Sequence, residues 1–175
     1  MKINGQEIEI FKKKTLFDYI LYSAIIVGGI IIDQLTKWLS VAFLKVEGSV
    51  PIIKSVIHLT YVENTGAAFG ILKNHRWVFI LISIITIIGF SAYLYLGHSE
   101  NRLYAVSIAM IISGGIGNMI DRLALGYVVD FIDFRLINFA VFNGADSFVC
   151  VGAGLLILAL ILDIKNEMKK EKGNG

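Results

Sequence analysis

Four long runs of apolar residues, separated by polar connections, dominate the pattern of this chain. The runs cover about residues 17–39, 77–96, 103–125 and 145–164. A helix of about twenty apolar residues is long enough to cross roughly 30 Å of hydrocarbon. The pattern therefore predicts an all-α integral membrane protein with four transmembrane helices, folded as a single membrane domain over residues 1–175.

The two longer connections, about residues 40–76 and 126–144, carry the remaining structure. Gly48 and Pro51 break helix in the first connection, and apolar residues then alternate with polar ones from 57 to 62. Alternation with a period of two is typical of a short, half-buried β-strand. We therefore expect a small β element between the first two helices, and an irregular second connection.

The composition places the chain among membrane proteins. Of its 175 residues, 56% are hydrophobic and 17% are charged, and the mean hydropathy is +0.73. Soluble domains are less apolar and more highly charged. A net charge of +2 is too small to indicate nucleic-acid binding. Cys150 is the only cysteine, which excludes an internal disulfide, and its apolar surroundings predict a buried core position.

Lysines and arginines indicate the orientation of the four spans. The side that holds both termini carries Lys2, Lys12, Lys13, Lys14, Arg102, Lys165, Lys169, Lys170 and Lys172, and the other side carries Lys45, Lys54, Lys73, Arg76 and Arg135. The excess of positive charge puts both termini in the cytoplasm and the β element outside it. The first apolar run is too long for a signal peptide and lacks a small-residue cleavage site, so we expect an uncleaved helix.

Four aspartates lie beside strongly apolar segments, namely Asp121, Asp130, Asp133 and Asp146. Carboxylates are costly near hydrocarbon, so such residues are candidates for function. No histidine pair or cysteine ligand lies near them in the sequence, which favours acid–base chemistry over metal chemistry. Two close carboxylates share a proton, so that one can activate water while the other protonates a carbonyl. Such a pair can hydrolyse a peptide bond without a metal or a covalent intermediate.

Five motifs occur in order between about residues 20 and 165. They are Asp33-Gln34-Leu35-Thr36-Lys37, Asn64-Thr65-Gly66-Ala67-Ala68-Phe69, Gly117-Asn118-Met119-Ile120-Asp121-Arg122, Val128-Val129-Asp130-Phe131 and Phe142-Asn143-Gly144-Ala145-Asp146-Ser147. Together they resemble the motifs of the lipoprotein signal peptidases, the signal peptidase II family of aspartyl peptidases. The resemblance implies a catalytic dyad of Asp130 and Asp146, with no cofactor and no metal. It also implies that further residues bind substrate or support the dyad: Asp33, Lys37, Asn64, Gly66, Asn118, Arg122 and Asn143.

The resemblance further implies a substrate and a location. The substrates are prolipoproteins, whose signal peptide is removed just before a diacylglyceryl-cysteine. The enzyme is expected to be a monomer in the bacterial cytoplasmic membrane, in contact with membrane lipids. One departure from the family pattern is Gly144, where the family usually has an apolar side chain. This glycine bears on the rigidity of the chain beside Asp146.

Several of these residues also have a purely structural interpretation. Asp33 with Gln34, Thr36 and Lys37 can form a polar cap on the first helix, Asp121 with Arg122 a local ion pair, Asn64 a turn, and Asn143 a helix cap. Asp130 and Asp133 lie three apart. An extended segment would send them to opposite faces, whereas a helix could place them on one face. The resemblance selects Asp130 and leaves Asp133 to the solvated side.

A different class of protein would use the same carboxylates in another way. A small polytopic transporter or channel would bind cations or relay protons with intramembrane aspartates. It would need carboxylates near the bilayer midplane and a repeated half. Here the aspartates gather at one face and no halves match. A structural membrane subunit would leave the buried aspartates unexplained, so a membrane peptidase is the favoured interpretation.

Overall fold

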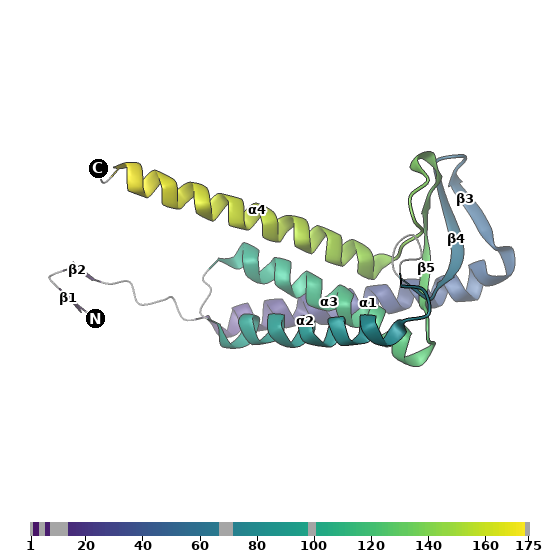
Figure 1. Cartoon of the computed structure of the whole chain (residues 1–175), viewed down its shortest axis with the longest axis horizontal. Helices are drawn as coiled ribbons and strands as arrows, with labels where there is room; N and C mark the ends of the chain where they lie inside the picture. Colours follow the sequence, from purple (N-terminus) through teal and green to yellow (C-terminus); the bar gives the residue numbers. More distant parts are fainter. Residues whose placement is uncertain (1, 4–5, 8–13, 67–71, 98–100, 174–175) are drawn as a thin grey trace.

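The computed structural model describes residues 2–3, 6–7, 14–66, 72–97 and 101–173. Four helices make up most of it: α1 (Leu16–Glu47), α2 (Arg76–Leu96), α3 (Arg102–Ala124) and α4 (Gly144–Gly173). All four are long and apolar enough to cross a membrane, as the hydrophobic pattern predicted. The helices run side by side in Figure 1, and a small sheet lies across one end of them.

Helix α1 begins at a capping box and runs further than predicted. The Thr15 hydroxyl accepts from the Asp18 amide, and the Asp18 carboxylate accepts from the Thr15 amide. The predicted polar cap around Asp33 is wrong. Asp33 and Lys37 lie in the middle of α1, and their side chains are buried against α3. The chain leaves the helix at Gly48, which adopts a φ of +74° that side chains rarely tolerate.

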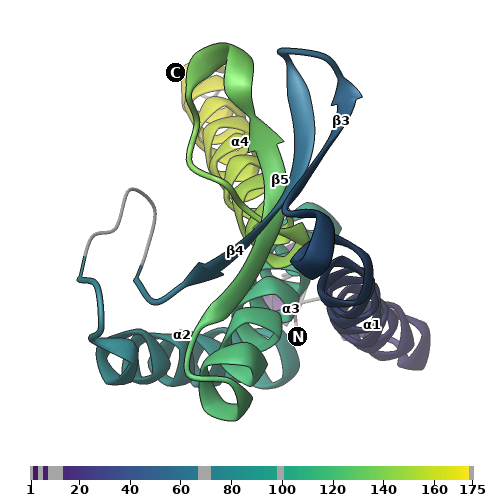
Figure 2. The same ribbon diagram turned by 90° about the vertical axis from the view of Figure 1, so that its right-hand side faces the viewer.

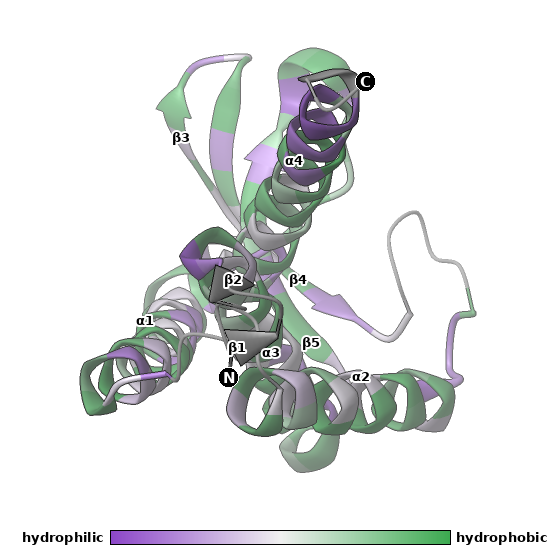
Figure 3. Ribbon diagram, turned by 90° about the vertical axis from the view of Figure 1, so that its left-hand side faces the viewer, coloured by the Kyte–Doolittle hydropathy of each residue, from purple (hydrophilic) through white to green (hydrophobic). Residues whose placement is uncertain are grey.

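Helix α3 is the centre of the bundle, and α1, α2 and α4 all pack on it. The buried core joins Tyr22 of α1 and Leu94 of α2 to Ala105, Ile108 and Ala109 on one side of α3. In contrast, most apolar side chains of α2 and α4 are exposed, as suits helices that face lipid. The hydropathy colours of Figure 3 show that apolar residues predominate along the helices and that the end of α4 is polar.

The three-stranded sheet has the order β3-β4-β5 and is antiparallel throughout. Its strands are β3 (Ser49–Ile53), β4 (Ile57–Asn64) and β5 (Val128–Phe134), followed by a short 3-10 turn, η2 (Arg135–Ile137). Strand β4 confirms the predicted strand in the first connection, although nearly all of its residues are half-buried and burial does not alternate along it. The second connection is not irregular as predicted, because β5 occupies much of it. Its Val-Val-Asp-Phe run is buried, so it lacks the alternation that marks a half-buried strand.

The sheet lies where α1 ends, α2 begins, α3 ends and α4 begins, as Figures 1 and 2 show from two directions. Strand β4 pairs with β5, so that Asn64 lies opposite Val128 and Val62 opposite Asp130. This register brings residues from the first connection to the side chains of the second. The sheet therefore assembles polar groups from distant parts of the chain above the helix ends.

Both chain ends lie at the other end of the bundle (Figure 1). The described part of the N-terminal segment contains a minimal hairpin, β1 (Lys2–Ile3) with β2 (Gln6–Glu7). At the C-terminus, the basic segment after residue 164 is helical. Helix α4 continues to Gly173, because Asp163, Glu167 and Glu171 alternate with lysines at helical spacing.

Candidate active site

Only one of the two aspartates of strand β5 faces the helices. The segment is extended, so Asp130 and Asp133 point to opposite faces of the sheet. Asp130 is only 1% exposed and lies against the helix ends. The carboxylate of Asp133 instead accepts from Arg135 at 2.8 Å and from the Thr60 hydroxyl at 2.8 Å. Asp133 is therefore part of a polar cluster on the outer face and not a free solvated side chain.

The first turn of α4 positions Asp146. Asn143 is the cap of this helix, because its Oδ1 accepts from the Asp146 amide at 2.9 Å. In return, Asp146 Oδ2 accepts from the Asn143 amide at 3.2 Å. The next free amide, that of Ala145, donates to Asp33 Oδ1 at 2.8 Å. The start of α4 is thus fixed by polar side chains, and Asp146 has one defined position in it.

Asn143 also connects the two aspartates. Its Nδ2 donates to Asp130 Oδ1 at 2.7 Å, while its backbone amide holds Asp146. The other oxygen of Asp130 accepts from Asn64 Nδ2 at 2.8 Å. Burial raises the pKa of Asp130 to about 7, the nearby charge of Asp146 adds to the rise, and the amides of Asn64 and Asn143 oppose it. Asp130 is therefore set to hold a proton near neutral pH.

A buried ion network lies behind this pair. Lys37 Nζ is 2.9 Å from Asp33 Oδ2 and 3.1 Å from Asp121 Oδ2, and all three side chains are nearly inaccessible. The same ammonium donates to Asn118 Oδ1 at 2.9 Å, and Asn118 Nδ2 donates to Asp146 Oδ1 at 2.7 Å. Lys37 is thus coupled to Asp146 through one amide side chain. Two carboxylates surround a single ammonium, so the pairing offsets the burial of these charges.

Two further residues belong to this network: Gln34, which was not assigned to the site from the sequence, and Asp121, which was a candidate but not one of the nine residues that the resemblance implies. Gln34 Nε2 donates to Asp33, to the Gly117 carbonyl and to Asp121. Asp121 also accepts from the Val129 amide at 3.0 Å, directly before Asp130 in β5. Asp121 therefore ties the end of α3 to the strand that carries Asp130. A sequence shows that these residues are polar beside apolar runs, but not that they meet across three elements.

Arg122 and Gly66 support the end of strand β4. Arg122 donates to the carbonyl of Gly66 at 3.3 Å, and its guanidinium lies 4.8 Å from the centre of the Phe79 ring. The Gly66 amide donates to Asn64 Oδ1 at 2.9 Å, which leaves the Asn64 amide nitrogen for Asp130. Residues 67–69 of the second motif lie outside the described residues. All nine site residues implied by the resemblance thus join one hydrogen-bonded network.

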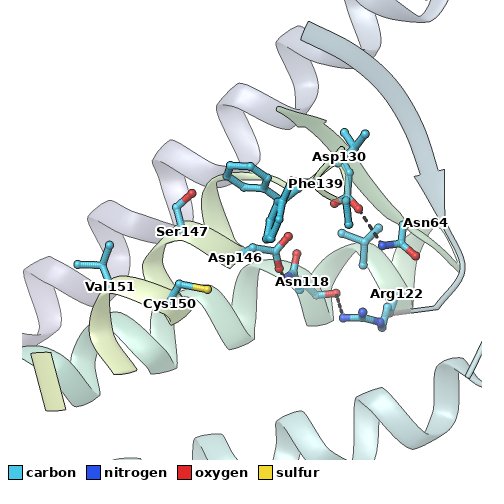
Figure 4. A pocket seen from close by; sticks show the side chains of 13 residues that line it. Asn64, Asn118, Arg122, Asp130, Phe139, Asp146, Ser147, Cys150 and Val151 are labelled. Carbon is cyan, nitrogen blue, oxygen red and sulfur yellow. Dashed lines mark hydrogen bonds between the residues drawn. The ribbon is translucent and has the colours of Figure 1, made fainter. Parts of the chain in front are cut away.

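The two aspartates open on one cavity of about 550 Å³. Figure 4 shows Asp130, Asp146 and Asn118 at its polar end, with Phe139 beside them and Cys150 and Val151 further along α4. Cys150 was expected in the core, but it is exposed in this cavity, on the turn of α4 that follows Asp146. Phe142, which precedes α4, also lines the cavity. Cys150 lies in a helical run that is apolar on every side, and such a run does not show which of its residues face a cavity.

The geometry suits acid–base chemistry on a substrate that lies partly in hydrocarbon. A carboxyl that holds its proton near pH 7 stands beside a carboxylate that accepts two hydrogen bonds, at the end of an otherwise apolar cavity. Within the described ranges, no three His, Cys, Asp or Glu side chains come together as a metal-ligand group. Gly144, where the family usually has a side chain, has room for a Cβ 3.5 Å from Asp33 Oδ1, an ordinary contact.

Comparisons with known proteins agree with this geometry. The family model described as Signal peptidase (SPase) II matches residues 25–162. Lipoprotein signal peptidase of Caldanaerobacter subterraneus is 49% identical over 140 residues, which cover 80% of this chain and 94% of that protein. The same enzyme of Bacillus subtilis is 42% identical over 154 residues, covering 87% and 99% of the two chains. A bacterial membrane enzyme solved by the in meso method superposes with a TM-score of 0.78 at 34% identity, covering 90% and 96%.

Fold and comparisons together define the class of this protein, an integral membrane peptidase of bacteria. The chain belongs to the signal peptidase II family, whose members remove the signal peptides of prolipoproteins. The transporter or channel interpretation is accordingly set aside.

Proposed function

We propose that Asp130 and Asp146 are the catalytic pair of this peptidase. The observation that carries the proposal is Asn143, which holds one carboxyl with its side chain and the other with its backbone amide. Both carboxyls also border the same cavity, so one peptide bond can reach them together. Asp133 has neither property, since it faces the other side of the sheet.

In this proposal the two carboxyls have different roles in the attack. Asp130 is protonated and donates its proton to the scissile carbonyl oxygen, while ionised Asp146 removes a proton from a water molecule. The water oxygen then bonds to the carbonyl carbon and gives a tetrahedral gem-diol. Asp146 returns the proton to the amide nitrogen as the carbon–nitrogen bond breaks, and Asp130 regains its own. Atoms and charges balance without a covalent enzyme intermediate.

The remaining network residues support this pair. Lys37, held by Asp33, orients Asn118 and so keeps the lone pairs of Asp146 turned toward the cavity. Asn64 fixes Asp130, and Gly66, which accepts from Arg122, donates to Asn64 at the end of β4. These are positioning roles, because each of these residues acts through another side chain. They would set the pKa and direction of the two catalytic carboxyls.

The substrate is a prolipoprotein cut immediately before a diacylglyceryl-cysteine. The cavity beside the dyad is lined by Val128, Phe139, Val141, Phe142 and Val151, an apolar surface suited to acyl chains. A lipid anchor next to the bond would place that bond at the depth of the dyad. We further propose a monomeric, single-domain enzyme in contact with membrane lipids, with both termini in the cytoplasm.

Cleavage of matched substrates tests this function. The purified protein in detergent receives one prolipoprotein in two forms, with and without the diacylglyceryl group on its cysteine. We expect rapid removal of the signal peptide from the lipidated form and little or none from the other. Equal rates for the two forms would refute the role of the lipid anchor, and no cleavage of either would refute the proposed substrate.

A further inference from the structure

A second cavity lies away from the two aspartates, where the last turns of α1 meet the sheet. It has a volume of about 240 Å³, and its lining includes Leu39, Phe43 and Leu44 of α1, Leu59 of β4 and Phe131 of β5. The described residues that line it all differ from those that line the cavity of the two aspartates. Phe131 follows Asp130 in an extended strand, so the two side chains point to opposite faces. This cavity, the α1 groove, therefore lies behind the strand that carries Asp130.

The surface of the α1 groove is apolar, although two hydroxyl side chains, those of Thr36 and Ser40, belong to its lining. Thr36 Oγ1 lies 2.9 Å from the carbonyl oxygens of Ile32 and Asp33, to which it donates. Ser40 Oγ donates to the carbonyl of Thr36 at 2.8 Å. Both hydroxyls are thus engaged by the backbone of their own helix. The groove is left with aliphatic and aromatic surface, which favours a hydrocarbon ligand over water.

The depth of the α1 groove matches the boundary between hydrocarbon and headgroups. Asp18 pairs with the exposed Arg102 at 3.2 Å, at the end of the bundle remote from the sheet. From Asp18, the groove residues 36–44 lie roughly 27–39 Å along the axis of α1, at a rise of 1.5 Å per residue. The hydrocarbon core is about 30 Å thick, and the whole bilayer about 40–45 Å. The groove therefore begins within the hydrocarbon on the side of the sheet and ends among the headgroups.

The α1 groove is open to lipid along one side. Phe43 at its rim is 67% exposed, and Leu39 is 37% exposed. Leu35 and Trp38 on the same helix are exposed as well, and tryptophan is typical of the boundary between membrane and water. The groove is thus continuous with an apolar surface of a helix that is suited to cross the membrane. Its volume is below the roughly 300–1,000 Å³ of pockets that enclose a whole small molecule, which suits a part of a lipid.

We infer that the α1 groove binds one acyl chain of a bilayer phospholipid, from the leaflet on the side of the sheet, and that this chain supports β5. The chain would contact Phe131 on the face of the strand opposite to Asp130. A void beside a side chain forfeits the packing contacts that would hold it, and a bound chain restores them. The site goes beyond the proposed function, because its ligand is a lipid of the membrane and not the substrate.

Leu39→Trp would fill the α1 groove from its rim, and Leu35→Trp is the matched control. Both residues are exposed leucines of α1, one helical turn apart, and of the two it is Leu39 that lines the groove. An indole at position 39 would occupy the volume proposed for the acyl chain. An indole at position 35 would instead lie in the lipid beside the helix.

The first measurement is photo-crosslinking of the purified full-length protein in phosphatidylglycerol vesicles, with a diazirine in the upper half of one acyl chain of the lipid. We expect crosslinks at Leu59 and Phe131 in the wild type and in Leu35→Trp. In Leu39→Trp the crosslinks at these two residues should fall about tenfold, which corresponds to about 1.4 kcal/mol of lost affinity. Crosslinks at Ile85 and Ile88, which are exposed on α2, should be equal in all three proteins.

The second measurement is the rate of cleavage of a lipidated prolipoprotein in detergent. Delipidated wild-type protein should cleave several times more slowly than the same protein after phosphatidylglycerol is added, because β5 then lacks its support. Leu39→Trp should have one rate under both conditions, since the indole replaces the chain. Leu35→Trp should respond to the lipid as the wild type does. Wild-type protein that cuts nothing would contradict the proposed function, whereas the crosslinks would still decide on the lipid site.

Several results would overturn the inference. Wild-type protein without crosslinks at Leu59 and Phe131 would exclude the site, and so would equal crosslinking in Leu39→Trp. Crosslinks at these residues only from a diazirine on the lipidated substrate would assign the groove to a substrate chain. A wild-type rate that does not respond to phosphatidylglycerol would contradict the support of β5. If Leu39→Trp does not fold, Leu59→Phe fills the groove from the sheet, and the crosslinks are then measured at Phe131.

Discussion

At the scale of single residues, the state of the two carboxyls depends on the amides around them. Asn143 caps α4 with its Oδ1 and donates to Asp130 with its Nδ2, so one side chain holds both the start of the helix and a member of the proposed dyad. Asp146 accepts hydrogen bonds from Asn118 and from the Asn143 amide in the first turn of α4. Asp130 is buried in a strand, and burial raises its pKa to about 7 although the amides of Asn64 and Asn143 oppose the rise.

We predict that cleavage is lost as the pH rises through about 7, because Asp130 then loses the proton that it donates. The hydrogen bond from Asn64 lowers the pKa of Asp130, so its removal in Asn64→Leu should raise that pKa. The half-point of the alkaline decline should move to higher pH by about one unit, alongside a lower maximal rate. Rates of cleavage measured between pH 5 and 10 provide the check.

Asp133→Asn is the control, since Asp133 lies on the opposite face of the sheet. The cleavage rate of Asp133→Asn should decline at alkaline pH with the same half-point as the rate of the wild type. A decline in Asn64→Leu that stays in place or moves to lower pH would show that Asp130 is not the group that titrates.

Sequence patterns predicted these residues unevenly. The ordered motifs led to Asp130, Asp146 and Asn143, and the structure brings all three to one cavity or its border. The same patterns placed Cys150 in the core, because a run that is apolar on every side does not show which face meets a cavity. They also left Gln34 unassigned, since its three partners lie on α1 and α3 and come together only in the fold.

At the scale of elements, the packing of α1 against α3 explains why the sequence predicted a helix end at the wrong place. The residues Asp33, Gln34 and Lys37 look like a polar cap, yet they share a face that is buried against α3. The helix continues to Glu47, and the hydroxyl of Ser40 donates to the carbonyl of Thr36 within it. A cluster of polar residues marks a helix end only where its side chains face water and not another helix.

Loss of the buried ammonium should therefore cost far more than loss of an exposed one. We predict that Lys37→Met destabilises the fold by about 3–5 kcal/mol, because Asp33 and Asp121 are left buried without a counter-ion. Lys45→Met is the matched control, since its partner Glu63 is exposed and the pair contributes at most about 1 kcal/mol. Thermal unfolding in detergent measures both. Equal melting temperatures for the two variants would contradict the coupling of α1 to α3 through Lys37.

At the scale of the whole molecule, the site exists because four helix ends and a sheet meet at one end of the bundle (Figure 1). The number of helices and their approximate positions could be predicted from hydropathy. The pairing of β4 with β5 could not, because the strands lie more than sixty residues apart and β5 has no alternating pattern. It is this pairing that brings Asn64 to Asp130.

The orientation of the molecule can be measured by labelling single cysteines in intact cells, in a Cys150→Ser background. We predict that cysteines at Gly48 and Arg135, beside the sheet, react with a membrane-impermeant reagent from outside. Cysteines at Gly5, outside the described residues, and at Lys172 should react only after the membrane is opened, because the excess of lysine and arginine holds both termini in the cytoplasm. Protection of position 48 in intact cells would place the site on the wrong side of the membrane.

The central claim is that Asp130 and Asp146 act together and Asp133 does not. Its most direct test compares the three variants Asp130→Asn, Asp146→Asn and Asp133→Asn on one lipidated prolipoprotein, with the melting temperature of each as a control for folding. Asparagine keeps the shape of the side chain and removes the ionisable group. We predict that the first two variants are folded and inactive, while Asp133→Asn keeps most of the wild-type rate. A folded Asp133→Asn without activity beside an active Asp130→Asn would contradict the account.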